Sequence, residues 1–138
     1  MKIIYVVGVF DLFHSGHVKL LERARALGDK LVVAINGDEM VSQYKRRPYL
    51  SETERLDVIK ACRYVDEAFI INDFDNKEVI LMYGINTIVH GDDWTGDSYM
   101  DQIRLTPEFV IENSIEFVYL PYTKGISTSD LIQKIKNS

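Results

Sequence analysis

The sequence has little cysteine and no apolar run long enough to span a membrane. Cys62 is the only cysteine among the 138 residues, so no internal disulfide can form, and we expect a reducing, cytoplasmic location. The longest apolar runs, such as residues 31–35, are far too short to cross a bilayer, so no membrane partner is expected. Lys2 is followed by only a short β-branched run before Gly8, which is not the pattern of a signal peptide.

Positive charge is also scarce. The 16 Lys and Arg residues face 21 Asp and Glu residues, and the net charge of −5 argues against a nucleic-acid partner, because such proteins are normally basic. The exception is the cluster Lys45, Arg46 and Arg47, which suits an anionic small molecule, with a solvated charged face as the alternative. With 46% hydrophobic residues, the chain is typical of a globular protein and is predicted to be a single domain, residues 1–138.

Strand and helix patterns alternate along the chain. Apolar runs predict five strands, at residues 2–7, 31–35, 68–71, 87–90 and 117–120. Helical spacing predicts helices at residues 17–27, 51–64, 77–83 and 127–136, with 102–113 helical in part and interrupted near Pro107. Residues 36–50 contain Pro48 and are expected to lack regular structure. The alternation predicts an α/β fold, Rossmann-like, with three α/β/α layers and a five-stranded, mostly parallel sheet.

Single residues mark the ends of two of these helices. Gly28 is predicted to be the C-cap of the first helix. Ser51 is predicted to be the N-cap of the second, with Glu54 completing a capping box. Cys62 lies within the second helical pattern and is expected to be a buried small side chain.

Two of the three histidines fall in residues 8–17, GVFDLFHSGH, between the first strand and the first helix. Gly8 and Gly16 let the backbone approach a ligand closely, and a helix N-terminus suits phosphate. His14 and His17 would then donate hydrogen bonds to the same phosphates; a polar turn with no ligand is the alternative. A zinc site is disfavoured, because it would need a third or fourth protein ligand nearby.

Two further polar segments follow strands and therefore belong to the same edge of the predicted sheet. In residues 121–130, PYTKGISTSD, Ser127 or Thr128 can cap the last helix and create a second phosphate site, or simply an ordinary capping turn. After the fourth strand, Asp92 and Asp93 could bind Mg²⁺ through water or hold an alcohol, or form a plain Asp-rich turn. Neither a Walker A loop nor a GxGxxG motif is present, which disfavours a kinase, a GTPase or a dinucleotide-binding protein.

Two of these segments carry a family resemblance. GVFDLFHSGH resembles the GxFDxxHxGH motif of the cytidylyltransferase family within the nucleotidyltransferase superfamily, and KGISTSD resembles that family's second motif, RTxGISTT. The resemblance extends over nearly the whole chain and includes the ER of SETER, RYVDE and GDDW. It implies transfer of CMP from CTP to a phosphorylated alcohol, with Mg²⁺ as cofactor and metal ligands unknown. An acceptor oxygen would attack the α-phosphorus in line, and the protein would position the groups and neutralise charge.

The resemblance also implies roles for individual residues. The catalytic residues implied are His14, His17, Arg46, Arg55 and Arg63. Nucleotide binding is implied for Gly8, Val9, Phe10, Asp11, His14, Gly16, His17, Arg46, Tyr122, Thr123, Gly125, Ile126, Ser127 and Thr128. Acceptor binding is implied for Tyr44, Lys45, Lys77, Asp92, Asp93 and Trp94. Segment 63–67 implies a homodimer.

The chain departs from the family pattern at several positions. Val9 stands where Thr is usual, Tyr44 where a substrate-binding Lys is expected, and Tyr122 where the second motif has Arg, a loss that Lys124 offsets in charge only. Residues 95–107 also form a longer segment than expected. GDDW favours glycerol 3-phosphate as acceptor; phosphoethanolamine, phosphocholine or a hydroxyalkyl phosphonate are alternatives. An ATP-dependent adenylyltransferase and a non-catalytic nucleotide-binding module also remain open.

Overall fold

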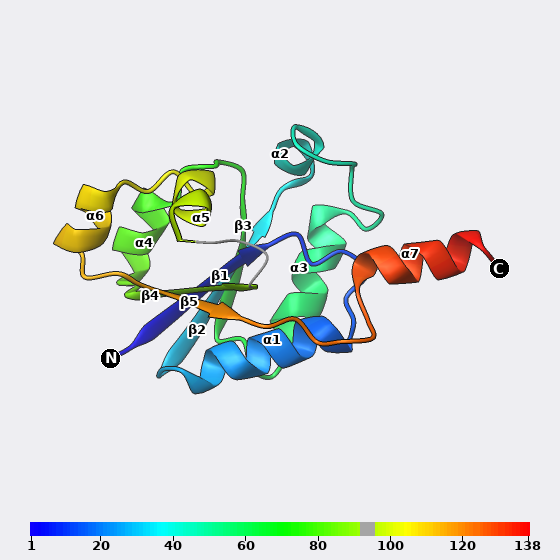
Figure 1. Cartoon of the computed structure of the whole chain (residues 1–138), viewed down its shortest axis with the longest axis horizontal. Coiled ribbons are helices and arrows are strands. Elements are labelled where there is room, and N and C mark those ends of the chain that lie inside the picture. The colour runs from blue at the N-terminus through cyan, green and yellow to red at the C-terminus, as the bar shows by residue number, and fades with distance from the viewer. Residues whose placement is uncertain (92–95) are drawn as a thin grey trace.

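The computed structural model describes residues 1–91 and 96–138, and Figure 1 shows a sheet with helices on both faces. The strands in these ranges are β1 (Ile3–Gly8), β2 (Lys30–Asn36), β3 (Glu67–Ile71), β4 (Thr87–Gly91) and β5 (Glu116–Leu120). The helices are α1 (Ser15–Ala26), α2 (Asp38–Ser42), α3 (Glu52–Ala61), α4 (Lys77–Tyr83), α5 (Gly96–Gln102), α6 (Pro107–Glu112) and α7 (Thr128–Lys136). Throughout the described residues, none of the helices has the length and apolar character that a membrane span needs.

The strand order β3-β2-β1-β4-β5 creates a switch point in the sheet. From β1 the chain builds outward through β2 and β3, and it then returns to the other side of β1 to add β4 and β5. All four neighbouring pairs are parallel; for example, Tyr5 is in register with Val32 of β2 and with Ile88 of β4. The predicted five-stranded α/β fold is confirmed, and the sheet is parallel throughout. Ligands in such sheets bind at the carboxyl ends of the strands beside the switch point, here between β1 and β4.

Two hydrophobic cores lie on opposite faces of the sheet because successive strand side chains alternate in direction. On one face, Ile4 packs in a cluster with Leu21 of α1 and Ile59 of α3. On the other face, Tyr5 belongs to a cluster that includes Ile80 of α4 and residues of α5. Figure 1 accordingly shows α1 and α3 on one side of the sheet and α4, α5 and α6 on the other, which is the predicted three-layer arrangement. The cores on both faces explain why the central residues of β2, 31–35, are all apolar.

The helix ends match the sequence prediction only in part. Ser51 caps α3 as predicted, with its Oγ accepting a hydrogen bond from the Glu54 amide at 3.2 Å. The helix ends at Ala61, three residues early, so Cys62 is its C-cap and is only partly buried. Gly28 is not the C-cap of α1, because Leu27 occupies that position. Glycine is needed there for another reason: a Cβ would lie 2.7 Å from the backbone oxygen of Lys2.

Two short helices were not predicted. The expectation that residues 36–50 lack regular structure is wrong for α2, a helix of five residues that begins after Gly37. The predicted partial helix at 102–113 corresponds to α6, which Thr106 caps and Pro107 opens. The preceding helix, α5, lies in the long segment 95–107. At the end of the chain, α7 projects from the body and has no buried residue (Figure 1).

Candidate active site

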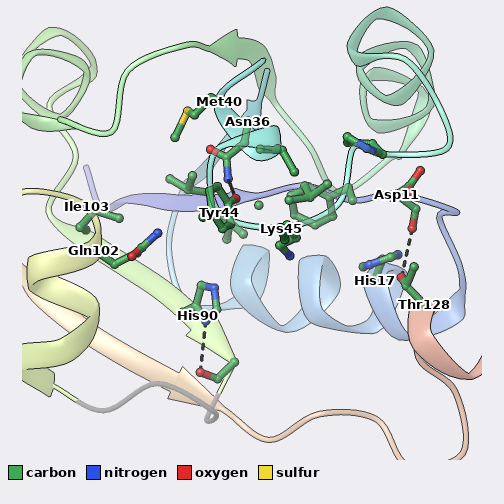
Figure 2. A pocket seen from close by; sticks show the side chains of 18 of the residues that line it. Asp11, His17, Asn36, Met40, Tyr44, Lys45, His90, Gln102, Ile103 and Thr128 are labelled. Atoms are coloured by element: carbon green, nitrogen blue, oxygen red, sulfur yellow. Dashed lines mark hydrogen bonds between the residues drawn. The ribbon is translucent and has the colours of Figure 1, made fainter. Parts of the chain in front are cut away.

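A cavity of about 560 Å³ opens at the carboxyl ends of β1, β2 and β4, beside the switch point of the sheet. Its walls come from the segment after β1, from the α2–α3 loop and from the N-terminus of α7. Figure 2 shows Asp11, His17 and Thr128 at one side, Gln102 and Ile103 at the other, and Tyr44 and Lys45 between them. The sequence-predicted residues that line it are Gly8, Val9, Phe10, Asp11, His17, Tyr44, Lys45, Arg46, Tyr122 and Thr128.

His14 and His17 form one unit at the start of α1. Nδ1 of His14, the N-cap residue, accepts a hydrogen bond from the Gly16 amide at 3.0 Å. Nδ1 of His17 accepts one from the His14 amide at 3.2 Å, and the rings stack with centroids 3.9 Å apart. Because both Nδ1 atoms are acceptors, each neutral ring carries its proton on Nε2. The local sequence therefore fixes two stacked imidazole N–H donors, of which His17 lines the cavity. We call His14, His17 and Thr128 the histidine corner.

Burial keeps the histidine corner uncharged at neutral pH. Burial, and then the neighbouring His14, lower the pKa of His17 from its ordinary value of 6.5 to about 4. Burial also lowers the pKa of His14. Both rings are thus neutral hydrogen-bond donors in the free protein, and an anion placed against them would raise both pKa values.

Thr128 connects the C-terminal segment to this corner. Its Oγ1 donates a hydrogen bond to the backbone oxygen of Asp11 at 3.1 Å and lies 3.4 Å from Nε2 of His14. Ser127 caps α7, with its Oγ accepting from the Asp130 amide at 3.0 Å. The N-termini of α1 and α7 therefore meet at one place, as the two motifs predicted. His14, Gly16, Thr123, Gly125, Ile126 and Ser127 do not line the cavity.

Asp11 organises the loop that carries the basic residues. Its buried carboxylate accepts hydrogen bonds from the amides of Tyr49 at 2.8 Å and Leu50 at 3.0 Å, and from Nη1 of Arg46 at 3.1 Å. Burial alone would raise the pKa of Asp11, but these hydrogen bonds outweigh it and hold the pKa below its ordinary value. Arg46 and Lys45 line the cavity, whereas Arg47 pairs with Glu39 outside it.

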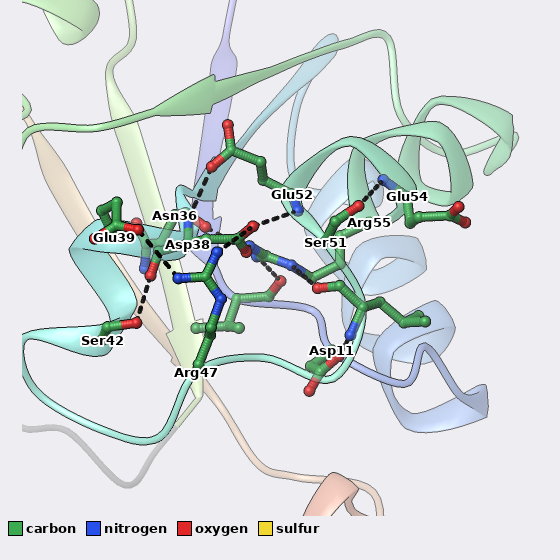
Figure 3. A network of polar contacts seen from close by, with 12 residues as sticks. Asp11, Asn36, Asp38, Glu39, Ser42, Arg47, Ser51, Glu52, Glu54 and Arg55 are labelled. Atoms are coloured by element: carbon green, nitrogen blue, oxygen red, sulfur yellow. Dashed lines mark hydrogen bonds and ion pairs between the residues drawn. The ribbon is translucent and has the colours of Figure 1, made fainter.

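Arg55 does not line the cavity, and all three nitrogens of its guanidinium group bind protein atoms (Figure 3). Nη1 donates to the backbone oxygens of Val9 at 2.8 Å and Asn36 at 2.9 Å. Nη2 pairs with Asp38 at 2.7 Å, and Nε donates to the backbone oxygen of Leu50 at 3.1 Å. The side chain is fully buried, so any part that Arg55 plays in catalysis would be to position the ends of β1 and β2.

The structure does not bring every predicted residue to the cavity. Arg63 is exposed and donates to the hydroxyl of Tyr64 at 2.9 Å. Lys77 does not line the cavity and pairs with Asp75 at 3.2 Å. The predictions for Asp92, Asp93 and Trp94 lie outside the described residues. Within residues 1–91 and 96–138, no group of three or more His, Cys, Asp or Glu side chains could hold a metal ion.

The end of the cavity opposite the histidine corner, which we call the amide end, was not predicted from the sequence. Its lining residues are Asn36, Phe74, Asn76, Tyr99, Gln102 and Ile103. Asn36 could have been predicted from the sequence, because it is a polar residue at the carboxyl end of a buried strand. Tyr99 and Gln102 carried no such signal, since they come from the unpredicted helix α5.

The comparison with protein families agrees with this geometry. A family model described as cytidylyltransferase-like matches residues 5–134. The chain belongs to the cytidylyltransferase-like family. The match includes both motifs, β1 from Tyr5 onward, and β2 to β5.

Individual relatives agree with the family. Glycerol-3-phosphate cytidylyltransferase of Bacillus subtilis is 41% identical over 138 residues, with 98% of each chain covered. Ethanolamine-phosphate cytidylyltransferase of Dictyostelium discoideum is 36% identical over 140 residues, which cover 97% of this chain and 38% of that protein. The crystal structure of a lipopolysaccharide core biosynthesis protein from Thermoplasma volcanium matches with a TM-score of 0.73 and 25% identity, covering 90% of this chain and 99% of that one.

The first prediction compares two arginines. Arg55→Met leaves the buried Asp38 carboxylate and three backbone carbonyls without their donor, and it should lower the free energy of unfolding by about 3 kcal/mol or more. Arg63→Met, at an exposed site, should change it by less than about 1 kcal/mol. Urea denaturation followed by circular dichroism measures both. Equal effects of the two substitutions would contradict the structural role of Arg55.

The second prediction concerns pH. Because the pKa of His17 is about 4 in the folded protein and near 6.5 when unfolded, the unfolded state binds more protons between these values. The stabilising contribution is complete above about pH 6.5 and is lost as the pH falls toward about 4. Urea midpoints across this range should decrease with decreasing pH, and less steeply in His17→Asn. An identical pH profile in the variant would refute the assignment.

Proposed function

We propose that this protein transfers CMP from CTP to sn-glycerol 3-phosphate, giving CDP-glycerol and pyrophosphate. The observation that carries the proposal is the meeting of two helix N-termini beside a stacked pair of imidazole donors, of which His17 lines a cavity that Lys45 and Arg46 also line. Helix N-termini and neutral N–H donors suit the phosphates of a nucleotide. The full-length similarity to a glycerol-3-phosphate cytidylyltransferase supports the choice of acceptor.

The reaction needs positioning and charge neutralisation more than a protein nucleophile. The triphosphate would lie against the histidine corner, where Nε2 of His14 and of His17 donate to its oxygens. An oxygen of the acceptor phosphate attacks the α-phosphorus as the bond to pyrophosphate breaks, and the pyrophosphate leaves with the bonding electrons. Lys45 and Arg46 would offset the negative charge of the two approaching phosphates. Magnesium, expected from the resemblance, would reach the site as the counterion of CTP.

Ethanolamine phosphate is the second candidate acceptor. The rings of Tyr44 and Phe74 pack edge to face, with their centroids 5.8 Å apart. Both rings line the cavity, and aromatic faces attract ammonium groups. The similarity to an ethanolamine-phosphate cytidylyltransferase points the same way.

Turnover of the histidine variants tests the proposal. Purified protein is incubated with CTP, Mg²⁺ and glycerol 3-phosphate, and CDP-glycerol is identified by mass spectrometry. His14→Asn and His17→Asn should each lower kcat by about 10² to 10³, because each removes a donor that acts on the developing charge. Lys19→Ala, on the exposed face of α1, should retain full activity and serves as the control. Folded histidine variants with normal turnover would refute the role of the corner, and a wild type that makes no CDP-glycerol would refute the function.

We also propose that the active form is a homodimer. The support is segment 63–67, whose likeness to the family pattern implied an interface, together with the exposed Arg63 and the partly exposed Val58 on α3. Analytical ultracentrifugation at micromolar concentration should give the mass of a dimer. A fully active monomer at that concentration would overturn this proposal and leave the proposed reaction untouched.

A further inference from the structure

The two asparagines at the amide end differ in how their side chains are used. Both atoms of the Asn76 side-chain amide are hydrogen-bonded within the protein. Its Oδ1 accepts from the Tyr5 hydroxyl at 2.7 Å, and its Nδ2 donates to the backbone oxygen of Phe74 at 3.0 Å. Asn36 is 92% buried, and its Nδ2 donates to the Tyr44 hydroxyl at 3.1 Å. Its Oδ1 is buried and has no hydrogen-bond partner in the described part of the chain. A buried acceptor without a donor costs free energy, so its retention needs an explanation.

The unpaired oxygen of Asn36 is held in a fixed place. Asn36 ends β2, in register with Ile71 of β3, and its backbone oxygen accepts from the buried Arg55. The Tyr44 hydroxyl holds the other half of the amide, and the Tyr44 ring rests against Phe74. Figure 2 shows Asn36 and Tyr44 joined by this hydrogen bond at the cavity. A preorganised acceptor of this kind binds a donor with little further loss of entropy.

The charges in the cavity decide which part of an acceptor molecule would reach Asn36. Lys45 and Arg46 line the cavity, and Arg46 pairs with Asp11 beside the histidine corner, whereas no Lys or Arg is among the six residues that define the amide end. A phosphate group is therefore drawn to the two cations, and an uncharged portion is left to extend toward Asn36. Oδ1 then needs a donor from that portion, and a hydroxyl group supplies one.

We propose that Asn36 Oδ1 accepts a hydrogen bond from a free hydroxyl group of the acceptor alcohol, and that Tyr44 positions the amide for this contact. The inference rests on the proposed function and makes Asn36 a specificity-determining residue. A site built to bind a hydroxyl discriminates strongly against an analogue without it, because its own polar group is then left unpaired. A quaternary ammonium, which has no N–H, cannot satisfy this oxygen.

The test is a comparison of acceptors in the wild type and in Asn36→Leu, which removes the amide but keeps the number and branching of the side-chain heavy atoms. Values of kcat/KM are measured for glycerol 3-phosphate and for its two analogues that lack one hydroxyl, 3-hydroxypropyl phosphate and 2-hydroxypropyl phosphate. In the wild type, one analogue should be about 10- to 100-fold worse than glycerol 3-phosphate. Asn36→Leu should lower kcat/KM for glycerol 3-phosphate by a similar factor and abolish the difference between glycerol 3-phosphate and that analogue.

Two further variants keep the inference testable if Asn36→Leu does not fold. Asn36→Asp retains an oxygen acceptor and adds negative charge, so phosphoethanolamine should improve relative to glycerol 3-phosphate. Tyr44→Phe keeps the ring but removes the hydroxyl that holds the Asn36 amide. This variant should weaken the discrimination between the acceptors without abolishing that discrimination. The KM for CTP should stay near the wild-type value in all folded variants.

The outcomes separate the inference from the proposed function. Equal loss of kcat/KM with all three acceptors in Asn36→Leu, or no change of preference in Asn36→Asp, would show a merely structural role and overturn the inference. In either case the formation of CDP-glycerol by the wild type would leave the proposed function standing. A wild type that makes no CDP-glycerol would overturn both.

Discussion

The ligand edge of the sheet depends on the hydrogen bonds and the ion pair that the buried guanidinium group of Arg55 makes. It joins the chain after β1, at Val9, to the last residue of β2, at Asn36, and to the loop before α3, at Leu50. These segments come from separate parts of the sequence, and the register of β1 with β2 ends at Gly8, before Val9. Asp38 balances the charge, so the group satisfies the backbone carbonyls at a point where the sheet has ended.

Asp11 performs the complementary task with the opposite charge. Arg55 donates hydrogen bonds to carbonyl oxygens, whereas the Asp11 carboxylate accepts hydrogen bonds from the amides of Tyr49 and Leu50. The backbone oxygen of Leu50 accepts a hydrogen bond from Arg55, and its backbone amide donates one to Asp11. The loop that presents Lys45 and Arg46 is therefore fixed from both sides, and the cavity exists before any ligand arrives. Such preorganisation is what a reaction based on positioning requires.

The sequence was sufficient where function and local structure use the same residues. His14 is both the helix cap and a member of the corner, so one short motif indicated the start of α1 to within two residues and also carries the proposed chemistry. Arg55 shows the limit of that approach. The motif ER marked it as functional, but only the fold reveals that its donors point into the protein. For Arg63, likewise, the motif carried no information about distance from the cavity.

The amide end was beyond prediction for a physical reason. Its residues come from the end of β2, the segment before α4, and α5, and their proximity is created by the packing of α4 and α5 on one face of the sheet. No periodicity within any one segment encodes that proximity. The error at Gly28 has the same origin, since a close approach to Lys2, just before β1, leaves no local pattern. Tertiary contacts overrode a reasonable local interpretation in both places.

The contrast between the two ends of the cavity bears on how the substrates are oriented. Both proposed substrates carry phosphate, and in-line attack requires their phosphates to face each other. Arg104 stacks on Phe74 but does not line the cavity, so the amide end offers a phosphate no cation from its lining residues. An acceptor that entered phosphate first toward Asn36 would meet a carbonyl oxygen and aromatic rings, which repel an anion. The neutral end thus disfavours the reversed orientation, and the acceptor phosphate is left beside Lys45 and Arg46, where the α-phosphorus of CTP is expected.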